Sequence, residues 1–211
     1  MQPRHHYEQA FEEYLRSRRI PYVAVHEARK ALLPEVRPAP LPSGAPAAAL
    51  KSFDFVLYAD TGNLLVECKG RKIAPRRART APSAAPPSRP GPRAPRQGRL
   101  ESWVTEDDVS SLTAWEALFG EGFTAAFVFI YWCEEQPSLP LFEEIFEYRA
   151  RWYAIRAVHV RDYARLMRPR SPRWRTVHLP GADFDQASRA LGARPSPHPL
   201  HAPAPEVVSP R

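Results

Sequence analysis

Two carboxylates and a lysine are spaced in this chain as metal-assisted hydrolysis of a phosphodiester would require. Asp54 precedes the tripeptide Glu67-Cys68-Lys69 by about a dozen residues. Carboxylate oxygens are preferred ligands of Mg²⁺ and Mn²⁺, and such an ion polarises a phosphate and acidifies a bound water. In this hypothesis Asp54 and Glu67 hold the cation together with the backbone carbonyl of Cys68. Lys69 would orient or deprotonate the water and offset developing negative charge.

Lysine is rare in this chain and concentrated around that motif. The 30 basic residues include four lysines, and three of these are Lys51, Lys69 and Lys72. Lysine and arginine are not interchangeable in a tight polar site, so the bias favours a specific use of the ammonium group. We predict nucleic-acid contacts at five cations on both sides of the motif, namely Lys51, Arg71, Lys72, Arg76 and Arg77.

Two predicted strands, 51–58 and 64–70, must position the motif. Asp60-Thr61-Gly62-Asn63 between them is typical of a turn. A two-residue turn at Thr61-Gly62 places Asp54 opposite Lys69 and Val56 opposite Glu67, so Asp54, Glu67 and Lys69 share one face. The other face would carry Phe53, Phe55, Leu57, Val66 and Cys68.

An amphipathic helix is predicted over residues 6–19. Its apolar stripe has helical spacing and consists of Tyr7, Ala10, Phe11, Tyr14 and Leu15. Glu8 and Glu12 are four residues apart and therefore share a side of this helix. Either one could add an outer carboxylate or one for a second metal.

The remaining pattern alternates strands and helices. A helix is expected from the N-cap Thr105 to the C-cap Gly120, followed by a central strand over 123–132 covered on both faces. Further expected elements are strands at 22–25 and 152–160, an edge strand at 173–177, and helices at 162–167 and 183–191. This order predicts an α/β fold with a mixed central sheet flanked by helices.

Proline and arginine are distributed unevenly. Residues 1–192 read as one domain with a Pro-rich insertion at 34–46, a disordered Pro/Arg-rich insertion at 73–100, and a disordered tail at 193–211. The net charge of +7 comes from 74–99, which holds seven arginines and no acid, so the rest has 23 basic against 23 acidic residues. This segment could bind phosphate backbones, or it could reflect codon bias alone.

Other composition features bound the class of protein. Cys68 and Cys133 show neither metal-site nor disulfide-scaffold spacing, which favours a cytoplasmic location. The longest apolar run, 123–132, is too short for a membrane helix, so we expect no membrane partner. Cations and aromatics interleave at 149–153 and 168–175, a pattern of nucleic-acid surfaces that more often reflects strand packing.

The order of a Glu-bearing helix, an Asp-bearing strand, a Glu-x-Lys strand, a helix and a strand resembles the PD-(D/E)xK nuclease superfamily. The similarity spans about 5–132 and is close in layout to archaeal Holliday-junction resolvases and restriction-endonuclease-like folds. Residues 6–12, His-Tyr-Glu-Gln-Ala-Phe-Glu, resemble the signature of the bacterial HYExAFE family. The resolvase pattern implies Glu8 as the helical carboxylate, with Glu12 second. Phe53 replaces the superfamily's Pro, and Asp108 stands where relatives often have Gln.

The resemblance implies a restriction-endonuclease-like three-layer core and a Mg²⁺- or Mn²⁺-dependent DNA endonuclease. Branched or end structures are the implied substrates, and a homodimer is compatible with this architecture. The motif by itself is weak, because a Glu–Lys pair on a strand is often a solvated ion pair. The alternative is a catalytically inactive nucleic-acid-binding or protein-interaction module that retains the fold.

Overall fold

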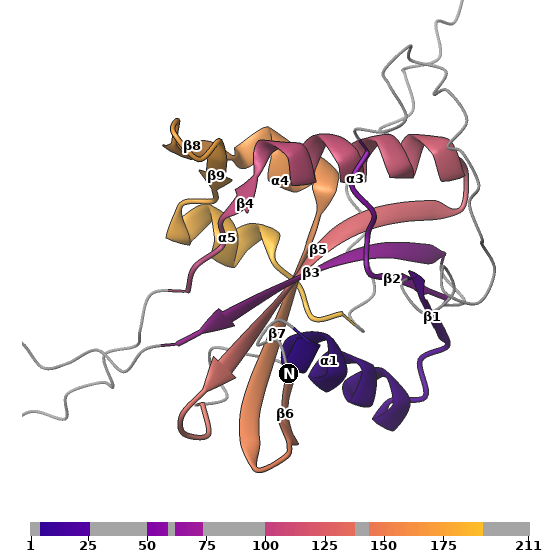
Figure 1. Ribbon diagram of the computed structural model, residues 1–211, viewed down its shortest axis with the longest axis vertical. Coiled ribbons are helices and arrows are strands. Elements are labelled where there is room, and N and C mark those ends of the chain that lie inside the picture. Colours follow the sequence, from indigo (N-terminus) through magenta and orange to yellow (C-terminus); the bar gives the residue numbers. More distant parts are fainter. Residues whose placement is uncertain (1–4, 26–49, 59–61, 74–99, 138–143, 192–211) are drawn as a thin grey trace, which may run out of the picture.

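The computed structural model of the chain describes residues 5–25, 50–58, 62–73, 100–137 and 144–191 (Figure 1). The Pro-rich stretch 34–46, positions 74–99 of the expected insertion and the tail 193–211 lie outside this set. The predicted disorder of the Pro/Arg-rich insertion and of the tail therefore stays a prediction.

A mixed six-stranded sheet forms the centre of the described fold. Its strand order is β1-β2-β3-β5-β7-β6, with β3 and β5 parallel and the other neighbours antiparallel. The strands are β1 (Tyr22–Ala24), β2 (Phe55–Leu57), β3 (Asn63–Lys72), β5 (Phe123–Cys133), β6 (Glu144–Tyr148) and β7 (Arg151–His159). The predicted α/β class with a mixed sheet is confirmed.

Helices cover both faces of this sheet (Figure 1). Helix α1 (His5–Ser17) packs its predicted stripe on one face, where Phe11 and Leu15 are fully buried against Val66 and Ile130. The other face carries α3 (Glu106–Phe119), α4 (Val160–Leu166) and α5 (Gly181–Ala187). Because β5 lies between these two layers, its side chains are apolar on both faces, as predicted.

The N-terminus of α3 is built by a capping box. The Thr105 side chain accepts from the backbone N–H of Asp108, and the Asp108 carboxylate accepts from the N–H of Thr105. Gly120 ends the helix with φ of 74°, a value that favours glycine. The sequence located both ends of this helix correctly.

The predicted register of the motif strands is wrong by two residues. Phe55 pairs with Val66 and Leu57 with Leu64, so the same register continued by one residue brings Asp54 opposite Glu67, not Lys69. The pairing is centred one residue earlier in the chain than the assumed turn at Thr61-Gly62. Since the shift is even, Glu67 and Lys69 keep the face that was predicted for them.

Phe53 lies on the opposite side of the sheet from the one predicted. Strand β2 begins only at Phe55, and Asp54 forms a bend, so the alternation of strand side chains does not extend to Phe53. Its ring packs on α3, with centroids 5.4 Å from Trp115 and 5.8 Å from Phe119.

A second small sheet was not predicted. It has the order β4-β9-β8 and consists of β4 (Val104–Thr105), β8 (Arg168–Ser171) and β9 (Thr176–His178). The expected edge strand at 173–177 therefore contributes to β9, the middle strand. Strand β6 was also missed, because its turn to β7 uses Arg149 and Ala150 at positive φ instead of glycine or asparagine.

Among the described helices, none has both the length and the apolar character needed to cross a membrane.

Candidate active site

The carboxyl group of Asp54 lies where β2 begins, against β3. Its backbone N–H donates to Val66 O (2.8 Å), and its Oδ2 accepts from the N–H of Cys68 (2.7 Å). Burial, the neighbouring carboxylate of Glu67 and the charge of Glu8 together raise the pKa of Asp54 to about 8, against the lowering effects of the Cys68 N–H and Lys69. The carboxyl groups of Glu67 on β3 and Glu8 on α1 thus both act on that of Asp54.

Lys69 connects the β3 carboxylate to helix α3. Its Nζ lies 2.7 Å from Glu67 Oε1 and 3.1 Å from Asp108 Oδ2. The side chains of Lys69, Glu67 and Asp108 are 15%, 18% and 9% exposed, so water screens these ion pairs only weakly.

The pKa directions fix the charges in this network. Burial opposes the charge of Lys69, but Glu67 and Asp108 outweigh it and raise the pKa of Lys69. Burial likewise opposes ionisation of Asp108, yet Lys69 and the capping hydrogen bond hold its pKa at about 2. Burial raises the pKa of Glu67 despite Lys69. Lys69 is therefore protonated at neutral pH and donates hydrogen bonds. This favours its predicted charge-stabilising role over deprotonation of a water.

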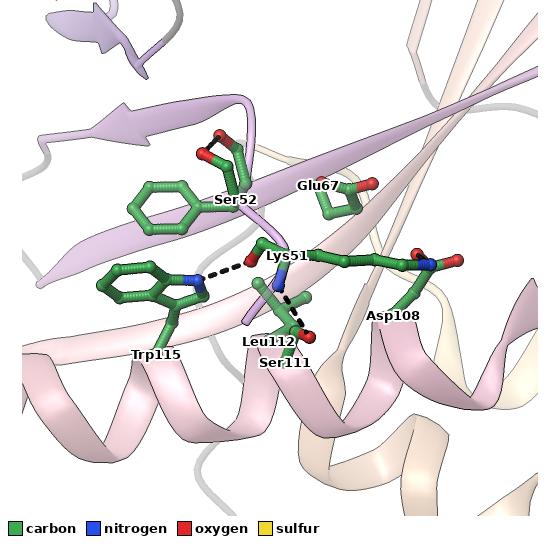
Figure 2. A pocket seen from close by; sticks show the side chains of 8 residues that line it. Lys51, Ser52, Glu67, Asp108, Ser111, Leu112 and Trp115 are labelled. Atoms are coloured by element: carbon green, nitrogen blue, oxygen red, sulfur yellow. Dashed lines mark hydrogen bonds and ion pairs between the residues drawn. The ribbon is translucent and has the colours of Figure 1, made fainter. Parts of the chain in front are cut away.

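Lys51 closes the α3 side of the network. Its Nζ donates to Asp108 Oδ1 (3.0 Å) and to Thr105 Oγ1 (3.1 Å). Figure 2 shows the Lys51 side chain running toward Asp108, with Glu67 nearby on β3. The pocket between them, lined also by Trp115, has a volume of about 10 Å³, enough for roughly one water.

Helix α1 presents Glu8, not Glu12, to this cluster. Glu8 contributes to the electrostatics of Asp54 and of Cys68. Glu12 points elsewhere, because its Oε1 accepts from Tyr22 Oη (2.8 Å) and from Arg16 Nη2 (2.6 Å). Of the two helical carboxylates, Glu8 is therefore the one that acts on Asp54, and its role in the site stays a prediction.

A close contact between Tyr7 and Gly70 sets the depth at which α1 packs on β3. A Cβ atom on Gly70 would lie 2.2 Å from Cδ2 of the Tyr7 ring. Only glycine lets the ring lie on the strand at this position. Since Glu8 follows Tyr7 and Gly70 follows Lys69, this contact also fixes how Glu8 meets the motif.

The other predicted residues are dispersed. Cys68 is half-buried, and desolvation of its thiol raises the pKa of that group. The guanidinium of Arg71 donates to Gly70 O (2.7 Å) and to Trp103 O, and Lys72 pairs with Glu134 (2.7 Å). Arg76 and Arg77 lie outside the described residues. Of the predicted nucleic-acid cations, the structure brings Lys51 to the cluster.

Asp108 is the site residue that sequence reasoning undervalued. It stands at the predicted start of α3, and its departure from the Gln of resolvase-like relatives put that helix's part in the site in doubt. A signal was present, because the Thr105-x-x-Asp108 capping box fixes the carboxylate at the helix N-terminus. Placing that end beside Lys69 required the tertiary packing.

The donor set fits a hard divalent cation in part. Two buried carboxylates and a backbone carbonyl are oxygen ligands of the kind that Mg²⁺ and Mn²⁺ take, with waters completing the shell. A cation would also offset the repulsion that raises the pKa of Asp54. Within the described ranges, no group of three or more His, Cys, Asp or Glu side chains could hold a metal.

Comparison of the chain with protein-family models, with curated proteins and with solved structures gives no match.

Proposed function

We propose that this protein is a Mg²⁺- or Mn²⁺-dependent DNA endonuclease of the PD-(D/E)xK type, with a restriction-endonuclease-like core. The observation that carries the proposal is the buried pairing of Asp54 with Glu67 beside a protonated Lys69. A protein that stabilised this region by packing alone would gain little from placing two carboxyl groups where ionisation of one opposes ionisation of the other. A cation and a phosphate bound there would account for the arrangement.

The residues have distinct roles in this proposal. Asp54 and Glu67 would hold the cation, which when bound polarises the phosphodiester and acidifies a water. Lys69, kept protonated by Glu67 and Asp108, donates hydrogen bonds and stabilises the negative charge that develops on the phosphate. Asp108 positions Lys69 from α3, and Glu8 adds negative charge from α1.

The alternative is a nucleic-acid-binding or protein-interaction module without catalysis. It is favoured by the partners that the carboxylates already have, because Asp54 accepts from the Cys68 N–H and Glu67 accepts from Lys69. In that case Lys69 itself neutralises the pair and no cation is needed. Cation binding therefore separates the two functions.

The deciding experiment combines cation titration with DNA cleavage. Mn²⁺ should bind with a stoichiometry near one in calorimetry, and the loaded protein should cut at least one of single-stranded, duplex and branched DNA. Asp54→Asn should abolish both cation binding and cleavage, since it removes a charged ligand. Lys69→Gln should lower cleavage by about two orders of magnitude while cation binding persists.

Glu13→Gln provides the matched control for Glu8→Gln. Glu13 lies on the same helix, and its side chain is 50% exposed at the surface. Glu8→Gln is expected to reduce cleavage, and Glu13→Gln to leave it unchanged. No cleavage of any of the three DNAs with Mn²⁺, together with no calorimetric change from Asp54→Asn, would refute the nuclease.

A further inference from the structure

A second cleft lies between the segment 100–103 and the small sheet. Its volume is about 250 Å³, and its walls include Glu101, Trp103, Arg170 and His178. The small sheet forms one side of it through β8 and β9. The nuclease roles proposed above use none of these residues, so the cleft needs its own account.

The cleft lies beyond the candidate active site in the direction in which β3 runs. Arg71 follows Lys69 by two residues on the same face, an advance of about 7 Å along a strand. Its guanidinium lies 4.0 Å from the ring centroid of Trp103, which forms the cleft wall. Two residues beyond Trp103, Thr105 accepts from the Lys51 Nζ of the active-site network.

The cleft brings two guanidinium groups to one indole. Arg170 lies 5.1 Å from the Trp103 centroid, on the ring that Arg71 also contacts. Arg170 is 41% exposed, and its ion pair with Glu101 is long, at 3.5 Å. Glu101 also accepts from Trp103 Nε1 (3.0 Å). Two arginines therefore face one half-exposed carboxylate, and the cleft carries an excess of positive charge.

Unsatisfied polar atoms occur at the same place. Among the described residues, the buried side-chain nitrogens and oxygens without a hydrogen-bond partner are Arg71 Nε and His178 Nδ1. His178 lines the cleft, and Arg71 stacks on its Trp103 wall. A buried polar atom without a partner is costly, and the N–H of Arg71 Nε is a donor in that position. Nδ1 of His178 donates or accepts according to the tautomer. The presence of both atoms here points to a polar ligand that can accept a hydrogen bond from Arg71.

We propose that this cleft binds an internal phosphate of the nucleic-acid strand, adjacent to the phosphate held at Lys69. A guanidinium matches a phosphate in geometry and charge, and an anion here would offset the repulsion between Arg71 and Arg170. The small sheet is thus the element that fixes the strand's path. The statement that this phosphate neighbours the scissile phosphate rests on the proposed nuclease function. The proposal that the cleft binds an anion does not.

The test is metal-free binding of a fluorescein-labelled 12-mer single-stranded DNA without a 5′ phosphate, measured by anisotropy over a salt series. Arg170→Gln should weaken binding about fivefold at low salt and reduce the slope of log K against log salt by about 0.7. Glu101→Gln should strengthen binding about twofold, because it removes the opposing charge. His178→Gln reports on the buried nitrogen and should weaken binding.

Arg16→Gln is the matched control, because Arg16 is a 57% exposed arginine of α1 on the far face of the sheet. The proposal is wrong if Arg170→Gln behaves like Arg16→Gln, or if the wild-type protein does not bind the DNA. It is also wrong if Arg170→Gln affects only DNA that carries a 5′ phosphate, since the cleft would then hold a strand end. If the wild-type protein cuts no DNA and Arg170→Gln still weakens DNA binding, the nuclease proposal fails and the proposed anion site in the cleft stands.

Discussion

At the scale of single residues, the ionised form of Asp54 lowers the free energy of unfolding. Burial and the adjacent Glu67 raise its pKa to about 8, above the 3.8 of an ordinary aspartate. The folded state therefore binds this proton more tightly than the unfolded chain. The contribution of Asp54 to stability is complete below pH 4 and is lost as the pH rises through 8.

Asp54→Asn is accordingly expected to stabilise the cation-free protein. Asparagine keeps an acceptor for the Cys68 N–H but carries no charge. The free energy of unfolding in EDTA should rise by at least about 1 kcal/mol at pH 8, and the gain should vanish near pH 4. Urea denaturation at both pH values measures it. Equal stability of wild type and variant at pH 8 would show that neither burial nor Glu67 opposes ionisation of Asp54.

At the scale of elements, the contact between α1 and β3 controls how the fold delivers Glu8. The Tyr7 ring occupies the space above Gly70, so an added methyl group must push the ring and its helix outward. Gly70→Ala should lower the free energy of unfolding by about 1–3 kcal/mol. It should also reduce cleavage, because Glu8 follows Tyr7 along the helix.

A double variant identifies the cause of this destabilisation. If the added methyl clashes with the ring, Tyr7→Ala combined with Gly70→Ala should be less destabilised than the sum of the two single variants. Simple additivity in thermal or urea unfolding would instead assign the loss to the β3 backbone.

The elements also separate what was predictable from what was not. Helix α3 was predicted with both caps, because Thr105, Asp108 and Gly120 act through their own backbone neighbours. The hairpin register was not predicted correctly, because a turn motif does not define the position about which the two strands pair. Strand β6 escaped detection since its turn uses arginine and alanine, which carry no turn signal.

At the scale of the whole molecule, the charge is concentrated in one segment. Positions 74–99 carry seven arginines and no acid, and without them the basic and acidic residues balance at 23 each. The composition of this segment, rich in proline and arginine, gives it little apolar surface to bury in a core. Replacing 74–99 with a short Gly/Ser linker should therefore preserve the unfolding transition.

The same replacement should weaken DNA binding chiefly at low salt. Counterion release scales with the number of phosphates neutralised, so the slope of log K against log salt should fall by several units if most of these arginines contact phosphates. An unchanged slope in a salt titration would remove the segment as a binding element and leave the cluster and the cleft.

The sequence by itself determined the residue types of the candidate site and the face of β3 that carries Glu67 and Lys69. Strand alternation has a period of two, so an even error in register leaves such an assignment intact. The helical stripe of α1 and the apolar β5 were equally local in origin. Each of these features follows from near neighbours along the chain.

Only the tertiary structure decided which distant groups meet the motif. Asp108 reaches Lys69 because α3 packs across β3, and Glu8 reaches Asp54 because Gly70 admits the Tyr7 ring on the other face. The second cleft likewise exists because the small sheet joins 104–105 to strands more than sixty residues later. Such contacts depend on packing between layers, which no local pattern of residues encodes.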